Sequence, residues 1–184
     1  MTTPHAASNA GISQGFIQEA RRLLTEEYLP KIERCVEKLT DEQIWWRPNP
    51  ESNSIGNLLL HLSGNARQWI VCGLSGELDQ RQRQTEFDAR EGIPRDELLG
   101  KLRTTVTEVS DVLAGFDPAR LLDKFPIQGT EATALAAIFH VTEHFSMHTG
   151  QIILLTKMLA KVDLVFYDFS TGNPVHTWHE AQRS

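Results

Sequence analysis

The sequence predicts an all-α protein, a four-helix bundle with long connections. The first observation is that four long segments carry apolar residues at every third or fourth position, which is the period of an α-helix. The second is that no segment alternates convincingly between apolar and polar residues, as a half-buried strand does. Helical segments of this kind bury their apolar stripes against one another, so a bundle is the expected architecture.

Length and composition fit a soluble protein with a substantial core. The chain has 184 residues, 40% hydrophobic and 23% charged, so we expect a single domain over 1–184. A net charge of −6 argues against a nucleic-acid partner held through its phosphates. No apolar run approaches the roughly 20 residues that span a bilayer, and residues 1–10 lack the pattern of a signal peptide. We expect a cytoplasmic protein with no membrane partner.

The first predicted helix covers 14–38, after a small and polar segment, 1–13, that we expect to be flexible. Pro30 lies inside this helix. Because proline has no backbone N–H and clashes with the preceding turn, it predicts a kink or a break. The apolar stripe consists of Phe16, Ile17, Ala20, Leu23, Leu24, Tyr28, Ile32, Val36 and Leu39.

Capping residues predict where the next two short segments begin. Thr40 and Gln43 have the spacing of a capping box, which predicts a short helical turn ending near two tryptophans. The sequence Arg47-Pro-Asn-Pro predicts an extended loop. Ser54 is a good N-cap for the second long helix, 55–74. His61 lies near the inward face of this helix, and Asn65 shares its side.

The second half of the chain contains the other two helices. A polar connector, 73–92, has a length that is often functional, and Pro94 suits the first turn of the third helix. A linker with a short extended piece near Phe125 follows. Thr130 is the predicted N-cap of the fourth helix, which runs to about residue 161. The tail, 162–184, contains several aromatic residues, so we expect it to pack on the bundle.

The fourth predicted helix carries His140, His144 and His148, spaced four residues apart. An i, i+4 pair lies on one face, so two of these imidazoles can bind one metal ion. Over eight residues the direction drifts by about 80°, so we do not expect all three to bind the same ion. His61 on the facing helix is the candidate third ligand, since bundle sites are built from facing helices. The alternative is that these histidines are hydrogen-bonded core or surface residues.

Two other patterns bear on the chemistry. The run His140-Val-Thr-Glu143-His144 matches the HxxEH pattern of inverted zinc peptidases, in which the glutamate is a general base. Cys35 and Cys72 form no CxxC pair and lie on or beside apolar helix faces, where a thiolate is disfavoured. We therefore expect any thiol used in a reaction to come from outside the chain.

The sequence resembles the DinB/YfiT-like family of metalloenzymes over about 16–160. The resemblance lies in the lead 54–58 into His61, in Trp69, and above all in the run His144-x-x-x-His148-Thr-Gly-Gln-Ile. It implies a DinB-like four-helix bundle, a homodimer, and one divalent metal held by His61, His144 and His148. Characterised members of the family include S-transferases that use low-molecular-weight thiols and a mycothiol-dependent maleylpyruvate isomerase. His140 is not among the ligands that the resemblance implies.

The histidine pattern favours a metal-dependent enzyme that acts on a small-molecule substrate, and the resemblance implies thiol S-transfer as its reaction. The ion is expected to be zinc or nickel, with iron or manganese as alternatives, because imidazole suits all of them. Asn65 and Glu143 are the catalytic candidates, and Gln151 shares a face with His148. The alternatives are a non-catalytic metal- or ligand-binding protein of the stress response, and an HxxEH-type hydrolase.

Overall fold

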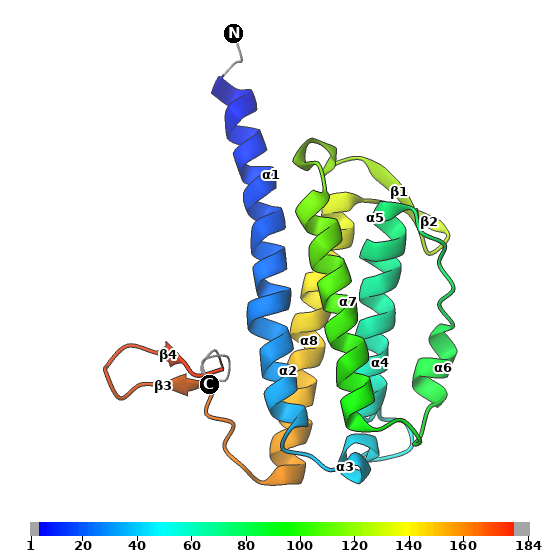
Figure 1. Cartoon of the computed structure of the whole chain (residues 1–184), viewed down its shortest axis with the longest axis vertical. Helices are drawn as coiled ribbons and strands as arrows, with labels where there is room; N and C mark the ends of the chain where they lie inside the picture. Colours follow the sequence, from blue (N-terminus) through cyan, green and yellow to red (C-terminus); the bar gives the residue numbers. More distant parts are fainter. Residues whose placement is uncertain (1–3, 179–184) are drawn as a thin grey trace.

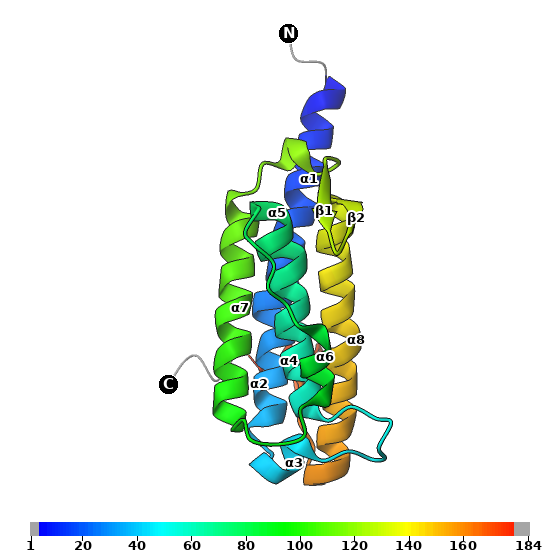
Figure 2. The ribbon, with the colours of Figure 1, turned by 90° about the vertical axis from the view of Figure 1, so that its right-hand side faces the viewer.

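Long helices lie side by side and form the body of the molecule (Figures 1 and 2). The computed structural model describes residues 4–178. Helix α4 packs against both α7 and α8, and α2 packs against α8. The predicted all-α bundle is therefore confirmed. The elements are α1 Pro4–Arg22, π-helix η1 Leu23–Tyr28, α2 Leu29–Val36, α3 Asp41–Trp45, α4 Ile55–Ala66, π-helix η2 Arg67–Cys72, α5 Gly73–Ser75, α6 Arg83–Asp88, α7 Arg95–Gly115, 3₁₀-helix η3 Pro118–Arg120, β1 Lys124–Ile127, β2 Thr130–Thr133, α8 Ala134–Ala160, β3 Tyr167–Asp168 and β4 Val175–His176.

The first long helix begins at Pro4, ten residues before the predicted start, and it is interrupted where the proline predicts. The six residues of η1 are wound as a π-helix directly before α2, whose second residue is Pro30. Pro30 cannot donate to the carbonyl of Glu26 four residues earlier. That carbonyl instead accepts a hydrogen bond of 2.9 Å from Trp178 Nε1. The tail thus supplies a donor beside the proline.

Helix caps appear at two of the predicted positions. Thr40 and Gln43 form the capping box of α3. Ser54 forms a second capping box with Asn57 at the start of α4, which fixes the register of the helix that carries His61. The predicted second helix corresponds to α4, η2 and α5, which run without a gap to Ser75.

The predicted start of the fourth helix is wrong by three residues. Thr130 lies in β2, and the N-cap of α8 is Thr133, whose hydroxyl accepts a hydrogen bond of 3.1 Å from Ala136 N. Strands β1 and β2 form an antiparallel hairpin that the sequence analysis missed apart from the extended piece at Phe125. Its two-residue loop, Gln128-Gly129, has positive φ at both positions, as a tight hairpin turn requires.

The described part of the tail packs on the first long helix. Leu164 and Trp178 are 2% and 3% exposed, and Lys31 Nζ lies 4.1 Å from the centroid of the Trp178 ring. Arg34 donates a hydrogen bond of 2.7 Å to the Thr177 hydroxyl. The short hairpin of β3 and β4 extends beside α2 (Figure 1). Residues 179–184 and 1–3 lie outside the described chain, so the predictions made for them are not tested.

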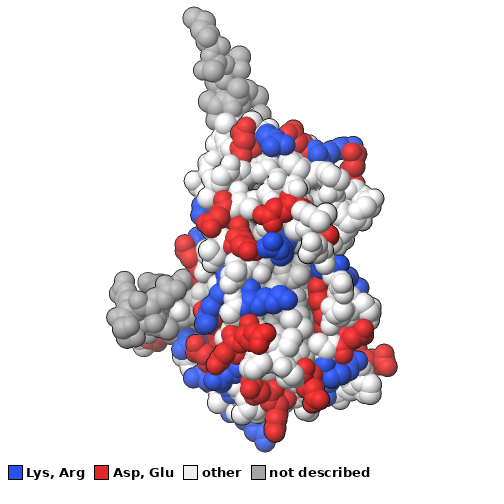
Figure 3. All heavy atoms as spheres, turned by 45° about the vertical axis from the view of Figure 1, so that its right-hand side comes forward, with Lys and Arg blue, Asp and Glu red and all other residues white. Residues whose placement is uncertain are grey.

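The surface carries charges of both signs. On the face in Figure 3, basic side chains lie among acidic ones rather than in a continuous basic area. None of the helices in the described residues is long and apolar enough to cross a bilayer.

Candidate metal centre

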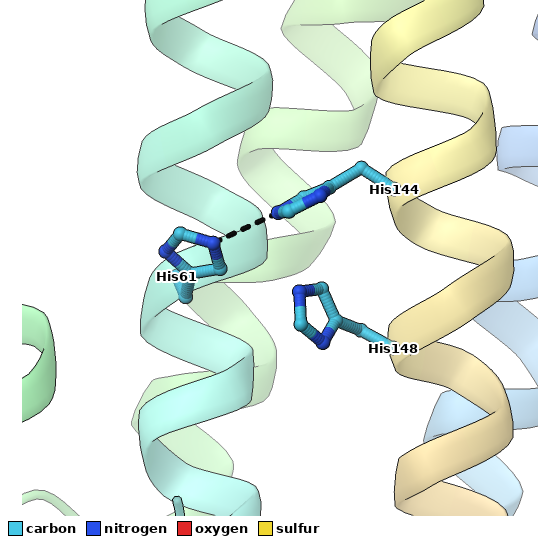
Figure 4. Close-up of side chains that lie close together, drawn as sticks. All are labelled: His61, His144 and His148. Atoms are coloured by element: carbon cyan, nitrogen blue, oxygen red, sulfur yellow. Dashed lines mark hydrogen bonds between the residues drawn. The ribbon is translucent and has the colours of Figure 1, made fainter.

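Three histidines from two helices meet inside the bundle. His61 comes from α4, and His144 and His148 come from successive turns of α8 (Figure 4). One ring nitrogen from each lies within 4.8 Å of the others, and the Nε2 atoms of His61 and His144 are 2.8 Å apart. The structure thus brings together the three residues that the sequence analysis selected.

The apolar stripes of the two helices direct these imidazoles inward. Leu58 and Leu62 flank His61 and are 2% and 0% exposed. On α8, Phe145 and Ile152 are both fully buried on either side of His148. Because burying these apolar side chains fixes the rotation of each helix, the histidines between them must face the partner helix. His61 and His148 are consequently buried themselves.

Two of the imidazoles are held at their outer nitrogen by an oxygen atom. His61 Nδ1 lies 3.0 Å from Glu86 Oε2, and His148 Nδ1 lies 2.6 Å from Gln151 Oε1. A carboxylate or amide oxygen only accepts hydrogen bonds, so Nδ1 carries the proton in both rings and Nε2 keeps its lone pair. This is the arrangement that orients histidine ligands in metal sites. The contact of Gln151 with His148 confirms the expectation from their i, i+3 spacing.

The Glu86 carboxylate is itself held by Arg81. Arg81 donates hydrogen bonds of 2.7 and 2.8 Å to its two oxygens. Arg81 Nη2 also lies 3.1 Å from His61 Nδ1, but its hydrogen bond goes to the nearer Glu86 Oε2, which leaves the carboxylate as the acceptor for His61. Burial by itself raises the pKa of Glu86, but the hydrogen bonds from Arg81 and His61 outweigh it and hold the pKa below its usual value. The carboxylate is therefore ionised beside His61 and accepts a hydrogen bond from the ring N–H.

The three imidazoles have the features of a cation-binding site, namely an unpartnered nitrogen and neutral rings. His148 Nε2 is buried and has no hydrogen-bond partner in the described residues. Burial, reinforced by the neighbouring histidines, lowers the pKa of His144 to about 3, and burial also lowers the pKa of His148. Both rings are thus neutral near pH 7, as metal ligands must be. The Nε2 atoms of His61 and His144 share a hydrogen bond of 2.8 Å, and a metal ion bound by both rings would take the place of the proton between them.

His140 lies outside this cluster. Its Nε2 is 3.1 Å from Asn65 Nδ2, and its ring packs on Trp69 with 4.2 Å between centroids. It also stacks on His144 at 5.2 Å. The catalytic candidate Asn65 therefore contacts His140, and its own Oδ1 is buried without a partner in the described chain.

The other candidate residues lie away from the three nitrogens. Glu143 is exposed on α8, one residue before His144 and thus about 100° around the helix from it. Cys35 and Cys72 are free and buried. Burial raises the pKa of the Cys35 thiol to about 11 and also raises that of Cys72. Neither thiol is suited to act as a nucleophile near neutral pH.

Sequence reasoning missed Glu86 and Arg81. Glu86 is one acidic residue among several in a polar connector without periodicity, and it lies 25 positions from His61. The available signal was the excess length of the connector, which indicated function but no residue. The contact depends on how α6 packs on α4, and a single sequence gives no way to read that packing.

Comparisons with known proteins identify the fold. A conserved protein of Enterococcus faecalis is 14% identical, with a TM-score of 0.59 over 83% of this chain and 98% of its own. A DinB-like protein of Bacillus cereus is 16% identical, with a TM-score of 0.61 over 82% and 93%. A DinB-like protein of Bacillus subtilis is 15% identical, with a TM-score of 0.60 over 79% and 94%. At these identities the likeness concerns the fold alone.

The sequence itself matches a family model over most of its length. No curated protein matches the chain. The family described as "Protein of unknown function (DUF1572)" matches residues 11–172. The three histidines cluster within a fold that is similar to that of the solved DinB-like proteins. The chain belongs to the DUF1572 family and has a DinB-like helical fold.

Proposed function

We propose that this protein binds one divalent metal ion through His61, His144 and His148. The observation that carries the proposal is the buried, unpartnered Nε2 of His148 beside the nitrogens of the other two rings. A buried polar atom without a partner costs free energy, and coordination to a cation would remove that cost. Three neutral nitrogens suit zinc or nickel, and iron or manganese are the alternatives.

We further propose that the site is catalytic and transfers low-molecular-weight thiols to small electrophiles. Three protein ligands leave a position open for another molecule, which is the usual plan of a catalytic zinc site. A divalent ion held by His61, His144 and His148 would lower the pKa of a thiol that enters the site and so supply a thiolate nucleophile. Its sulfur would bond to an electrophilic carbon, the leaving group would depart with its electron pair, and the thiol proton would pass to solvent. The buried thiols of Cys35 and Cys72 support the use of an external thiol.

The chain's own part in this reaction is to hold three imidazoles neutral and correctly turned. Glu86 and Gln151 accept hydrogen bonds from Nδ1–H of His61 and of His148, so both Nε2 lone pairs stay available. His140 stacks on His144 and is paired with Asn65, and we propose that His140 and Asn65 line the position where the substrate lies. Glu143 is exposed on the same helix. Its role in shuttling protons stays a prediction.

Two alternatives remain distinct from this proposal. A non-catalytic metal-binding protein would use the same three ligands and would differ only in lacking turnover. The HxxEH hydrolase requires His140 and His144 as the paired ligands. The geometry gives it no support, since His140 Nε2 pairs with Asn65. The expectations of a homodimer and of a cytoplasmic location stay predictions, and the mass of the protein in solution tests the first.

The decisive experiment is elemental analysis of protein purified without a His-tag or a chelating column, alongside His144→Ala. We expect about one metal ion per chain in the wild type and loss of the ion in the variant. Equal metal content in the two proteins, or no uptake of divalent ions by either, would overturn the metal site. Metal-loaded protein is then incubated with a panel of low-molecular-weight thiols and the electrophile monochlorobimane. Metal-dependent turnover supports transfer, and its absence across the panel favours the non-catalytic alternative.

A further inference from the structure

The connector between α5 and α7 contributes one buried residue, and that residue contacts a candidate ligand. Between residues 76 and 92 every other side chain is exposed or half-buried, whereas Glu86 is 8% exposed. Its carboxylate lies 3.0 Å from His61 Nδ1. A buried carboxylate is costly unless its oxygens are paired, so its burial at this point calls for an explanation.

Arg81 makes the position of this carboxylate specific. The guanidinium donates through Nε to Glu86 Oε1 and through Nη2 to Glu86 Oε2, which is the two-point geometry that fixes a carboxylate in direction as well as distance. Arg81 Nη1 in turn donates a hydrogen bond of 2.8 Å to Gln68 Oε1 on η2. The pair is thereby tied to the same long helix that carries His61.

Separate contacts anchor the backbone of α6. Asn57 Nδ2 donates hydrogen bonds of 2.7 and 2.9 Å to the carbonyls of Glu86 and Ala89. Arg47 donates a further bond of 2.9 Å to the Ala89 carbonyl. The Phe87 ring lies 4.8 Å from the His61 ring. Because these contacts do not involve the Glu86 side chain, altering that side chain leaves the anchors of α6 in place.

Gly64 allows the carboxylate to come this close. It faces the pair one turn beyond His61 on α4, and a Cβ built there would lie 2.1 Å from Glu86 Oε1 and 2.9 Å from Arg81 Nε. No carbon atom fits at such distances, so any side chain at this position would displace the Glu86–Arg81 pair. The absence of a side chain at residue 64 is therefore a requirement of the His61–Glu86 contact.

We infer that Glu86 is a positioning residue for His61 and that the connector, through Glu86, sets the metal affinity of the three-histidine site. The inference rests on the proposed metal site. By accepting a hydrogen bond from Nδ1–H, Glu86 keeps the Nε2 lone pair directed at His144 and His148 and makes the ring a stronger ligand. Linkage makes the effect reciprocal, so metal binding must also stabilise the docked connector.

The test measures zinc affinity by competition with a chromophoric chelator, using the full-length tag-free protein and the variants E86Q and G64A. Loss of such an outer partner typically weakens metal affinity by about 10- to 100-fold, and we expect losses in this range for both variants. The control is G100A on α7, where a Cβ would have nothing within 4 Å. It should bind zinc as the wild type does.

Two further readouts separate positioning from a purely structural role. Nitrogen-15 NMR of the zinc-loaded protein should show the His61 proton on Nδ1 in the wild type, with this signal altered in both variants. Limited proteolysis should show that zinc protects residues 77–92 in the wild type and protects them less in G64A. Circular dichroism of the variants should match the wild type, since the anchors of α6 are intact.

The outcomes are distinct. If the wild type binds zinc and the affinities of both variants lie within a factor of about two of the wild-type value, the inference on Glu86 is overturned and the metal site stands. A factor of about two is well below the expected loss of affinity. If the wild type itself binds no divalent ion, the proposed metal site fails, and the inference fails with it. Weaker zinc binding by both variants but not by G100A, with the altered His61 signal, supports the inference.

Discussion

His140 and His148 occupy equivalent positions in the sequence, since each lies one helical turn from His144, yet their surroundings differ. The inner nitrogen of His140 is already paired with Asn65, and its ring is packed on Trp69. The inner nitrogen of His148 is buried without a partner among the described residues, while Gln151 holds its outer nitrogen. The comparison shows that helical spacing does not distinguish a candidate ligand from a packed histidine. The distinction lies in whether the Nε2 atom already has a hydrogen-bond partner.

Replacing each of these two histidines with alanine gives the largest expected difference. His148→Ala removes the unpartnered Nε2 atom that is a candidate metal ligand, so we expect the metal content to fall from about one ion per chain to near zero. His140→Ala removes a ring whose Nε2 is already paired, and the metal should stay. Elemental analysis of the two proteins after the same dialysis measures the effect. If His140→Ala lost as much metal as His148→Ala, our choice of ligands on α8 would be wrong.

The outer partners of the two histidines provide a finer test. Gln151→Ala leaves the Nδ1 proton of His148 without its acceptor, and we expect zinc affinity to weaken by about 10-fold. Asn65→Ala disturbs the pairing of His140 and should change the affinity by less than about 3-fold, since Asn65 touches no candidate ligand nitrogen. Chelator competition gives both values. Equal effects of the two substitutions would remove the distinction between the two turns of α8.

Cys35 can be compared with His148, because its sulfur is also a potential metal ligand and is also buried. Because burial raises the pKa of its thiol to about 11, the thiolate is scarce in the folded protein at pH 8, and iodoacetamide should modify Cys35 only after unfolding. The thiol of an unfolded chain ionises near pH 9. Below that pH, the protonated Cys35 thiol therefore makes its full contribution to the free energy of unfolding. It is lost as the pH rises from about 9 toward about 11.

Mass spectrometry of native and urea-treated protein checks this expectation. Cys35→Ala provides the control, and it should retain its metal in full, since Cys35 lies outside the three-histidine cluster. Rapid modification of Cys35 in the native protein would show that the thiol is accessible and would weaken the case for an external thiol.

The sequence by itself determined the helical bundle, the capping of α3 and α4, the interruption at Pro30 and the presence of paired histidines on one face of α8. These features depend on local chemistry, namely apolar period, capping side chains, the missing N–H of proline and i, i+4 spacing. It was less successful between β1 and the start of α8. There Thr130 and Thr133 are equally good caps, and only the pairing of β2 with β1 selects Thr133.

Only the tertiary structure decided which histidine nitrogens are paired and which residues hold them. Glu86 reaches His61 across 25 positions because α6 docks on α4 and Gly64 leaves the space. Trp178 reaches the Glu26 carbonyl across 152 positions. Such contacts depend on the relative placement of elements, which the hydrophobic period within one helix does not encode. The spacing of the histidines thus made a site possible, and the packing around them determines which nitrogens remain free to bind an ion.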